Sequence, residues 1–211
     1  MKAIVVDLEL TQNPGEKPTI IQIGACLINS KSHQIQGIFD EITNGGSEPN
    51  EFITQLTRIT VEQVQAARPL RDVLIDFWKW VEEAGVGGSL FDWGGGDVRA
   101  LREASRELNV EVPRLHALDL KEMSKLFRQA KNAKAKGGLA NTLSLFGMEF
   151  YKSELQHNAL YDAVNTSFLL FRFEEIISFG IGVEKTHGNP KVRNLNEARV
   201  EFEKLVEKKR I

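Results

Sequence analysis

The sequence predicts an α/β domain with a mixed β-sheet, and three observations support this. Short apolar runs rich in β-branched residues open the chain, as expected for buried strands. The first three runs are separated only by turn-rich loops, which is typical of an antiparallel meander. Later runs are separated by helical patterns, which is typical of parallel strands joined by crossovers. A chain of 211 residues fits one such domain with an appended segment.

The elements are expected in the following order. Five strands are expected at residues 3–11, 19–29, 33–43, 89–91 and 115–118. Helices are expected within residues 52–67 and at 70–84, 98–108, from 119 onward, and at 156–177 and 195–209, with an irregular segment at 180–193. Thr60 and Gln63 have the spacing of a capping box, which predicts a helix start at that point. We expect residues 1–180 to form the domain and residues 181–211 a C-terminal extension with a charged helix.

Composition limits the classes of function. The formal net charge is −2, so a nucleic-acid site must come from a local basic patch. The single cysteine, Cys26, excludes a disulfide framework and a thiolate zinc cluster, and it fits a reducing compartment. The sequence shows no secretory signal and no apolar run of the roughly 18 residues that a membrane span needs. These features predict a cytoplasmic protein with no membrane partner, and they leave the oligomeric state, monomer or homodimer, open.

Two carboxylates lie at the end of the first strand. Asp7 and Glu9 are two residues apart, so both side chains project from the same face. Adjacent like charges on a covered strand are costly unless a cation neutralises them, and Mg²⁺ and Mn²⁺ prefer oxygen ligands. The alternative is a strand end that simply reaches solvent.

Three later segments carry further candidates. Asp97 follows three glycines and is either a helix N-cap or a third acid of the site. His157 and Asp162 flank a helix start at Asn158, so they converge only if the preceding loop folds back toward Asp162. Residues 121–136 hold six basic residues and one acid, which fits either a solvated helix face or a phosphate-binding track.

These residues together resemble the DEDDh 3′–5′ exonucleases, the RNase T-like branch of the ribonuclease H-like fold. Asp7 and Glu9 match the first family motif, Asp97 the second acidic motif, and His157 and Asp162 the final His-x4-Asp motif. Within the family the sequence is most similar to the Eri-like group. That similarity rests on residues 20–25, 52–60, 93–94, 138–140 and 157–163, within a match that runs from about residue 3 to about 172. One departure is Arg58, where the family usually has glycine.

The resemblance implies a five-stranded ribonuclease H-like sheet and a two-metal mechanism. Asp7, Glu9 and Asp162 would bind two Mg²⁺ or Mn²⁺ ions, with Asp97 completing the site and His157 acting as general base. Single-stranded RNA or DNA would be hydrolysed from its 3′ end to nucleoside 5′-monophosphates. The expected substrate contacts are Leu8, Leu10, Thr11, Leu56 and Trp93, with core packing as the alternative for Leu56.

Two other classes of function remain open at this point. One is a non-catalytic nucleic-acid or protein-binding module on the same fold, although such a module has no need for five clustered charges. The other is an endonuclease of ribonuclease H-like fold, which cleavage polarity would distinguish. The C-terminal extension has charges of alternating sign, which favours a solvated or packing helix over a nucleic-acid arm.

Overall fold

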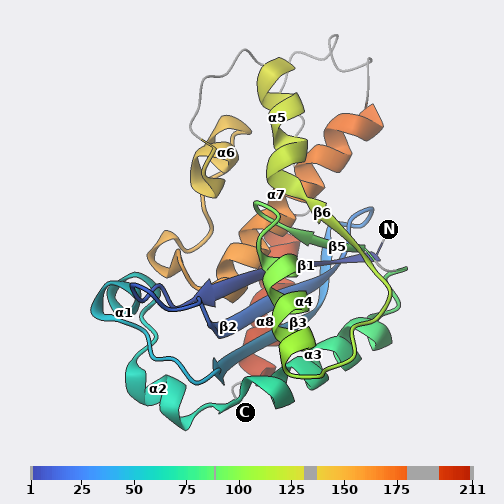
Figure 1. Cartoon of the computed structure of the whole chain (residues 1–211). Helices are drawn as coiled ribbons and strands as arrows, with labels where there is room; N and C mark the ends of the chain where they lie inside the picture. Colours follow the sequence, from blue (N-terminus) through green and yellow to red (C-terminus); the bar gives the residue numbers. More distant parts are fainter. Residues whose placement is uncertain (1, 88, 131–136, 180–194, 210–211) are drawn as a thin grey trace.

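The structure is a computed structural model that describes residues 2–87, 89–130, 137–179 and 195–209 (Figure 1). Its centre is a six-stranded sheet in the order β4-β3-β2-β1-β5-β6. The strands are β1 (Lys2–Leu10), β2 (Ile20–Asn29), β3 (Gln34–Asn44), β4 (Arg68–Pro69), β5 (Ser89–Asp92) and β6 (His116–Asp119). Strands β1, β2 and β3 form the predicted antiparallel meander, and β5 and β6 add in parallel beside β1. The predicted α/β fold with a mixed sheet is therefore confirmed.

The sheet has one strand more than predicted. Strand β4 has two residues and pairs in parallel with the end of β3, where Thr43 lies opposite Arg68. A two-residue strand that contains Pro69 has no alternating pattern and lacks one backbone donor, so its sequence carries no strand signal.

Helices connect the strands and cover both faces of the sheet (Figure 1). They are α1 (Glu51–Thr57), α2 (Val61–Ala66), α3 (Leu70–Ala84), α4 (Asp97–Glu107), α5 (Leu120–Ala130), α6 (Leu139–Leu145), α7 (Ala159–Phe179) and α8 (Leu195–Lys209), with a 3-10 turn at Ser153–Leu155. Helices α3 and α8 have the predicted bounds, and the predicted capping box of Thr60 and Gln63 begins α2. Helix α7 begins directly after the predicted cap at Asn158, and the earlier part of the predicted helical region, from residue 156, lies outside it because His157 has a left-handed backbone.

Alternation along β1 separates the two larger hydrophobic cores of the described residues. Ala3 and Val5 pack in the core that contains α7 and α8, whereas Ile4, Val6 and Leu8 pack in the core that contains α3 and α4. Side chains two residues apart point to the same face of a strand. The carboxylates that follow Val5 at every second position therefore belong to the α7 side of the sheet.

Helix α8 packs on this domain rather than extending away from it. Ala198, Phe202 and Val206 are buried in the core beside α7. The predicted boundary at residue 180 and the predicted irregular segment at 180–193 lie outside the described residues. Among the helices that the structure describes, none has the length and apolar character needed to cross a membrane.

Candidate active site

Three carboxylates converge where β1 ends. One oxygen each from Asp7, Glu9 and Asp162 lies within 4.8 Å of the other two. Asp7 and Glu9 come from the α7 face of β1, and Asp162 lies in the first turn of α7. The structure thus brings together acids that are 155 residues apart in the chain, as the sequence motifs predicted.

A glycine in β2 allows α7 to reach these acids. Gly24 is the cross-strand partner of Asp7, and α7 begins directly against it. A Cβ atom at Gly24 would lie 2.0 Å from the backbone nitrogen of Leu160 and 2.1 Å from the carbonyl carbon of Ala159. No side chain fits in that space, so the start of α7 rests on the strand backbone itself.

Polar side chains fix the first turn of α7 in this position. Gln22, the cross-strand partner of Glu9, accepts the backbone N–H of Ala159 at 3.1 Å. Its amide nitrogen donates to the carboxylate of Asp40 at 2.8 Å, which holds the Gln22 side chain in place. Asn158 caps the helix, as predicted: its side chain accepts from Tyr161 at 3.4 Å and its carbonyl accepts from Asp162 at 2.9 Å.

The fourth acid, Asp97, begins α4. It is not the helix N-cap, so that alternative is wrong: Gly96 occupies the cap position. The buried Asp92 instead accepts the N–H groups of Gly95 at 3.0 Å and Val98 at 3.2 Å. This leaves the carboxylate of Asp97 for the acidic cluster, where its charge raises the pKa of Asp7.

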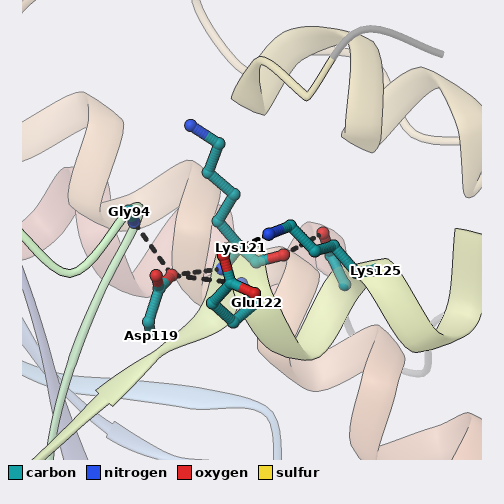
Figure 2. A network of polar contacts seen from close by, with 6 residues as sticks. Gly94, Asp119, Lys121, Glu122 and Lys125 are labelled. Carbon is teal, nitrogen blue, oxygen red and sulfur yellow. Dashed lines mark hydrogen bonds and ion pairs between the residues drawn. The ribbon is translucent and has the colours of Figure 1, made fainter.

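A second aspartate joins the glycine loop to α5 (Figure 2). One oxygen of Asp119 accepts the N–H of Gly94 at 3.0 Å together with those of Lys121 at 2.7 Å and Glu122 at 3.2 Å. Lys125 forms an ion pair with Glu122. In contrast, the ammonium group of Lys121 points away from both acids and pairs with no carboxylate among the described residues. The predicted basic track continues to Lys131, Lys134 and Lys136, which lie outside the described residues.

Burial makes the charged form of each acid in the cluster unfavourable, and neighbouring carboxylates add to this effect at Asp7, Glu9 and Asp97. Burial, followed by the charges of Asp162 and Asp97, raises the pKa of Glu9 to about 8. Burial and the neighbouring carboxylates raise the pKa of Asp7 well above its ordinary range, and burial raises that of Asp162 to about 7. The Oδ1 atom of Asp162 is also buried without a hydrogen-bond partner. Converging carboxylate oxygens with one unsatisfied acceptor fit a hard divalent cation.

His157 lies beside this cluster in the loop before α7. Its φ angle is 64°, and an interaction of its backbone with the Asp162 carboxylate lowers the pKa of that acid. The predicted approach of this loop to Asp162 is therefore present. Burial and the nearby charge of Arg58 lower the pKa of His157. The imidazole is thus predominantly neutral at neutral pH, which is the form that accepts a proton.

Arg58 occupies the position where the family usually has glycine. It has φ 66° and ψ 9°, and its N–H donates to the carbonyl of Thr54 at 2.8 Å at the end of α1. Arginine at this position therefore still forms the left-handed C-cap of α1. The guanidinium donates to the carbonyl of Gln156 at 3.4 Å, which places a positive charge beside His157.

The five expected substrate contacts have different surroundings. Leu8 is buried in the core on the α3 side, and Thr11 is buried with its hydroxyl accepting the N–H of Thr19 at 2.9 Å. Leu10 lines a cavity of about 350 Å³ together with Asp97. Leu56 is half-buried, and the half-buried Trp93 packs against the core beside α7.

Sequence reasoning missed the residues that support the site. These are Gln22, Gly24, Asp92 and Asp119. A glycine inside a buried apolar strand is a signal of close backbone approach, so Gly24 could have been singled out. Asp92 ends a strand before the glycine loop, so its bonds to Gly95 and Val98 depend on how that loop folds. Asp119 was predicted only as the start of a helix, because its bond to Gly94 depends on the same loop.

The RNase T family model, which describes an exonuclease, matches residues 4–170. ERI1 exoribonuclease 2 of Danio rerio is 31% identical over 196 residues, a match that covers 80% of this chain and 34% of that protein. DNA polymerase III PolC-type of Streptococcus sanguinis is 30% identical over 198 residues, covering 92% of this chain and 12% of the polymerase. The chain therefore spans about a third or less of the length of these curated relatives.

Solved structures show the same fold at low sequence identity. The nuclease domain of 3′hExo, a DEDDh family member bound to rAMP, has a TM-score of 0.69 at 20% identity, covering 82% of this chain and 92% of that domain. Cell-death related nuclease 4 has a TM-score of 0.70 at 13% identity, covering 85% of this chain and 64% of that one. All five predicted acid and imidazole positions lie within the residues that the family model matches.

Proposed function

The chain belongs to the RNase T exonuclease family, and on that premise we propose that it is a metal-dependent 3′–5′ exonuclease of single-stranded nucleic acid. The observation that carries the proposal is the convergence of Asp7, Glu9 and Asp162 around one unsatisfied buried oxygen. A module that only binds nucleic acid gains nothing from buried acids, because they repel phosphate and destabilise the fold.

Asp7, Glu9 and Asp162 would hold a pair of Mg²⁺ or Mn²⁺ ions, with Asp97 completing the site. When bound, these ions would neutralise charge on the phosphate and lower the pKa of the attacking water. His157, neutral through its lowered pKa, takes a proton from that water. The water oxygen forms a bond to the terminal phosphorus while the bond from phosphorus to the 3′ oxygen of the preceding nucleotide breaks. That oxygen is then protonated, and a nucleoside 5′-monophosphate leaves.

The chain's own residues also suggest where the strand lies. Leu10 and Asp97 share a cavity, which supports a contact of Leu10 with the terminal nucleotide. We assign Leu56 and Trp93 to base stacking, and Leu8 and Thr11 to contacts made through the backbone, because the side chains of Leu8 and Thr11 are buried. The relatives named above include an exoribonuclease and a DNA polymerase, so both RNA and DNA are candidate substrates.

The test uses single-stranded RNA and DNA oligonucleotides labelled at the 5′ end, with Mg²⁺, with Mn²⁺ and with chelator. We expect a ladder that shortens from the 3′ end, and its loss with chelator or with Asp162→Ala. The relative cleavage rates of the two oligonucleotides would show whether RNA or DNA is the preferred substrate. A retarded band without cleavage in either metal would favour the binding module, and internal cuts on a 3′-blocked substrate would favour an endonuclease.

A further inference from the structure

Helix α8 lies outside the residues that the family model matches, yet it contacts the segment that carries Asp162. Phe202 of α8 is fully buried. Its ring meets that of Tyr161 edge-on, with centroids 5.4 Å apart and an interplanar angle of 89°. Tyr161 immediately precedes Asp162 in the first turn of α7. The aromatic contact therefore acts one residue away from the acidic cluster.

A chain of hydrogen bonds leads from the next residue of α8 to the same place. Glu203 accepts the hydroxyl hydrogen of Tyr151 and forms an ion pair with Lys152 at 2.6 Å. The backbone N–H of Tyr151 donates to the side chain of Asn165 at 2.7 Å. The Asn165 amide nitrogen then donates to the carbonyl of Tyr161 at 2.8 Å. Adjacent residues of α8 thus reach Tyr161 through its ring and through its backbone.

The far end of α8 makes a third connection, to the start of α7. Lys209 forms an ion pair with Glu41 at 3.1 Å and donates to the carbonyl of Asp40. The side chain of Asp40 accepts from Gln22, which in turn accepts the first N–H of α7. All three connections end within the first turn of α7.

We propose that α8 is a positioning element for Asp162 and that Phe202 is its principal positioning residue. The ring of Phe202 limits how far Tyr161 can rotate or shift toward α8, and the Glu203 connection fixes the Tyr161 carbonyl. Since the Asp162 oxygens must converge with those of Asp7 and Glu9, a small rotation of this turn would separate the ligand atoms. The proposal rests on the function proposed above, because it assumes that these acids bind metal.

The test compares Phe202→Leu with Phe173→Leu. Both phenylalanines are fully buried in the same core, and each has an edge-on aromatic partner. Phe173, however, lies 11 residues after Asp162 in α7. Each variant is prepared as the full chain, and its melting temperature is measured. Mn²⁺ binding is then measured by titration calorimetry. Asp162→Ala, which removes one of the three converging carboxylates, is the negative control.

We expect Phe202→Leu to weaken Mn²⁺ binding about 10-fold, in the range seen when residues behind metal ligands are changed. Phe173→Leu should stay within about twofold of the unmodified protein at a similar loss of melting temperature. Equal effects of the two variants, or unchanged binding in Phe202→Leu, would overturn the positioning role. Absence of Mn²⁺ binding by the unmodified protein would instead overturn the proposed function, and with it this inference.

A second variant covers the case in which Phe202→Leu does not fold. Tyr151→Phe removes only the hydroxyl that bonds Glu203 and keeps the aromatic ring in its place. A severalfold loss of Mn²⁺ affinity at nearly unchanged melting temperature would support the role of α8. Full affinity in Tyr151→Phe, combined with a Phe202→Leu chain that does not fold, would assign α8 to general stability and overturn the proposal.

Discussion

Arg58 combines a strained backbone with an electrostatic effect on the residue proposed as general base. Its φ of 66° costs a non-glycine residue about 1–2 kcal/mol, and its charge lowers the pKa of His157. A positive neighbour disfavours the protonated imidazole, so it extends the pH range in which His157 is neutral. If His157 is the general base, Arg58 therefore sets the pH of the acid limb of the rate profile.

We predict that Arg58→Gln raises the pKa of His157 and moves the acid limb of the kcat/KM profile to higher pH. The rate at high pH should be little changed, because His157 is neutral there in both proteins. The measurement is cleavage of a labelled oligonucleotide from pH 5.5 to 9 at fixed Mn²⁺. His157→Ala is the reference: it should lose about 10²- to 10⁴-fold in rate and the corresponding limb of the profile. If the pH profile of Arg58→Gln coincided with that of the unmodified protein, Arg58 would have no effect on the pKa of His157.

At the scale of the secondary-structure element, the contact between β2 and α7 decides whether the site can form. A methyl group at Gly24 would overlap the backbone of Ala159 and Leu160, and backbone cannot move aside as a flexible side chain can. We predict that Gly24→Ala destabilises the protein by about 3 kcal/mol and abolishes cleavage, because α7 must shift away from Asp7. Gly37→Ala is the matched control on β3, where the nearest atom to a new Cβ is 3.7 Å away. Urea unfolding and the cleavage assay would measure both variants, and similar results for the two would contradict this account.

Helix α5 offers a second test at this scale. The Lys121 side chain passes the glycine loop that leads to Asp97, with its Cδ 3.8 Å from where a Cβ of Gly94 would lie, and its ammonium pairs with no carboxylate among the described residues. Lys125, in contrast, forms an ion pair with Glu122 (Figure 2). We predict that Lys121→Gln raises KM for an oligonucleotide severalfold and lowers the salt dependence of binding by about one charge. Lys125→Gln should change either value much less. A nucleoside 5′-(p-nitrophenyl phosphate) has no upstream phosphate and should be cleaved equally by all three proteins. If Lys121→Gln raised KM for this small substrate as much as for the oligonucleotide, Lys121 would not contact the upstream strand.

Helix α3 and strand β1 could be predicted from the sequence because their local signals are strong. Apolar spacing defined α3 at 70–84, and the strand pattern placed Asp7 and Glu9 on one face. The sequence could not predict that Asp92 rather than Asp97 satisfies the N–H groups at the start of α4, because an aspartate in either position fits a capping pattern. It also could not give the distance between Asp162 and β1, since that distance depends on the packing of α7 against Gly24.

At the scale of the whole molecule, we expect the acidic cluster to make stability depend on pH and on bound metal. The pKa of Glu9 in the folded protein is about 8 and that of Asp162 about 7, both above the values of about 4 expected when unfolded. The folded state therefore binds more protons than the unfolded state between these values, and stability falls as pH rises. We predict that the melting temperature in chelator falls between pH 5 and pH 8 and that Mn²⁺ reverses the loss at pH 8.

Asp7→Asn is the control for this prediction. It removes one charge from the cluster, so in chelator the protein should melt higher at pH 8 and show a weaker dependence on pH. It should also lose the stabilisation by Mn²⁺. Scanning calorimetry across the pH range would measure all three effects. A melting temperature that rises with pH equally in both proteins would show that these acids do not control stability.

The alternation of side chains along β1 also limits how this gene can change in length. With Ala3 held opposite Ile28, removing one codon between those for Ala3 and Asp7 would shift the later pairing by one residue and turn both carboxylates toward the core that contains α3 and α4. Removing two codons would restore the face, although the strand would be shorter. Viable length variants in this part of the gene should therefore differ by even numbers of residues, a parity that sequencing of naturally occurring variants would reveal.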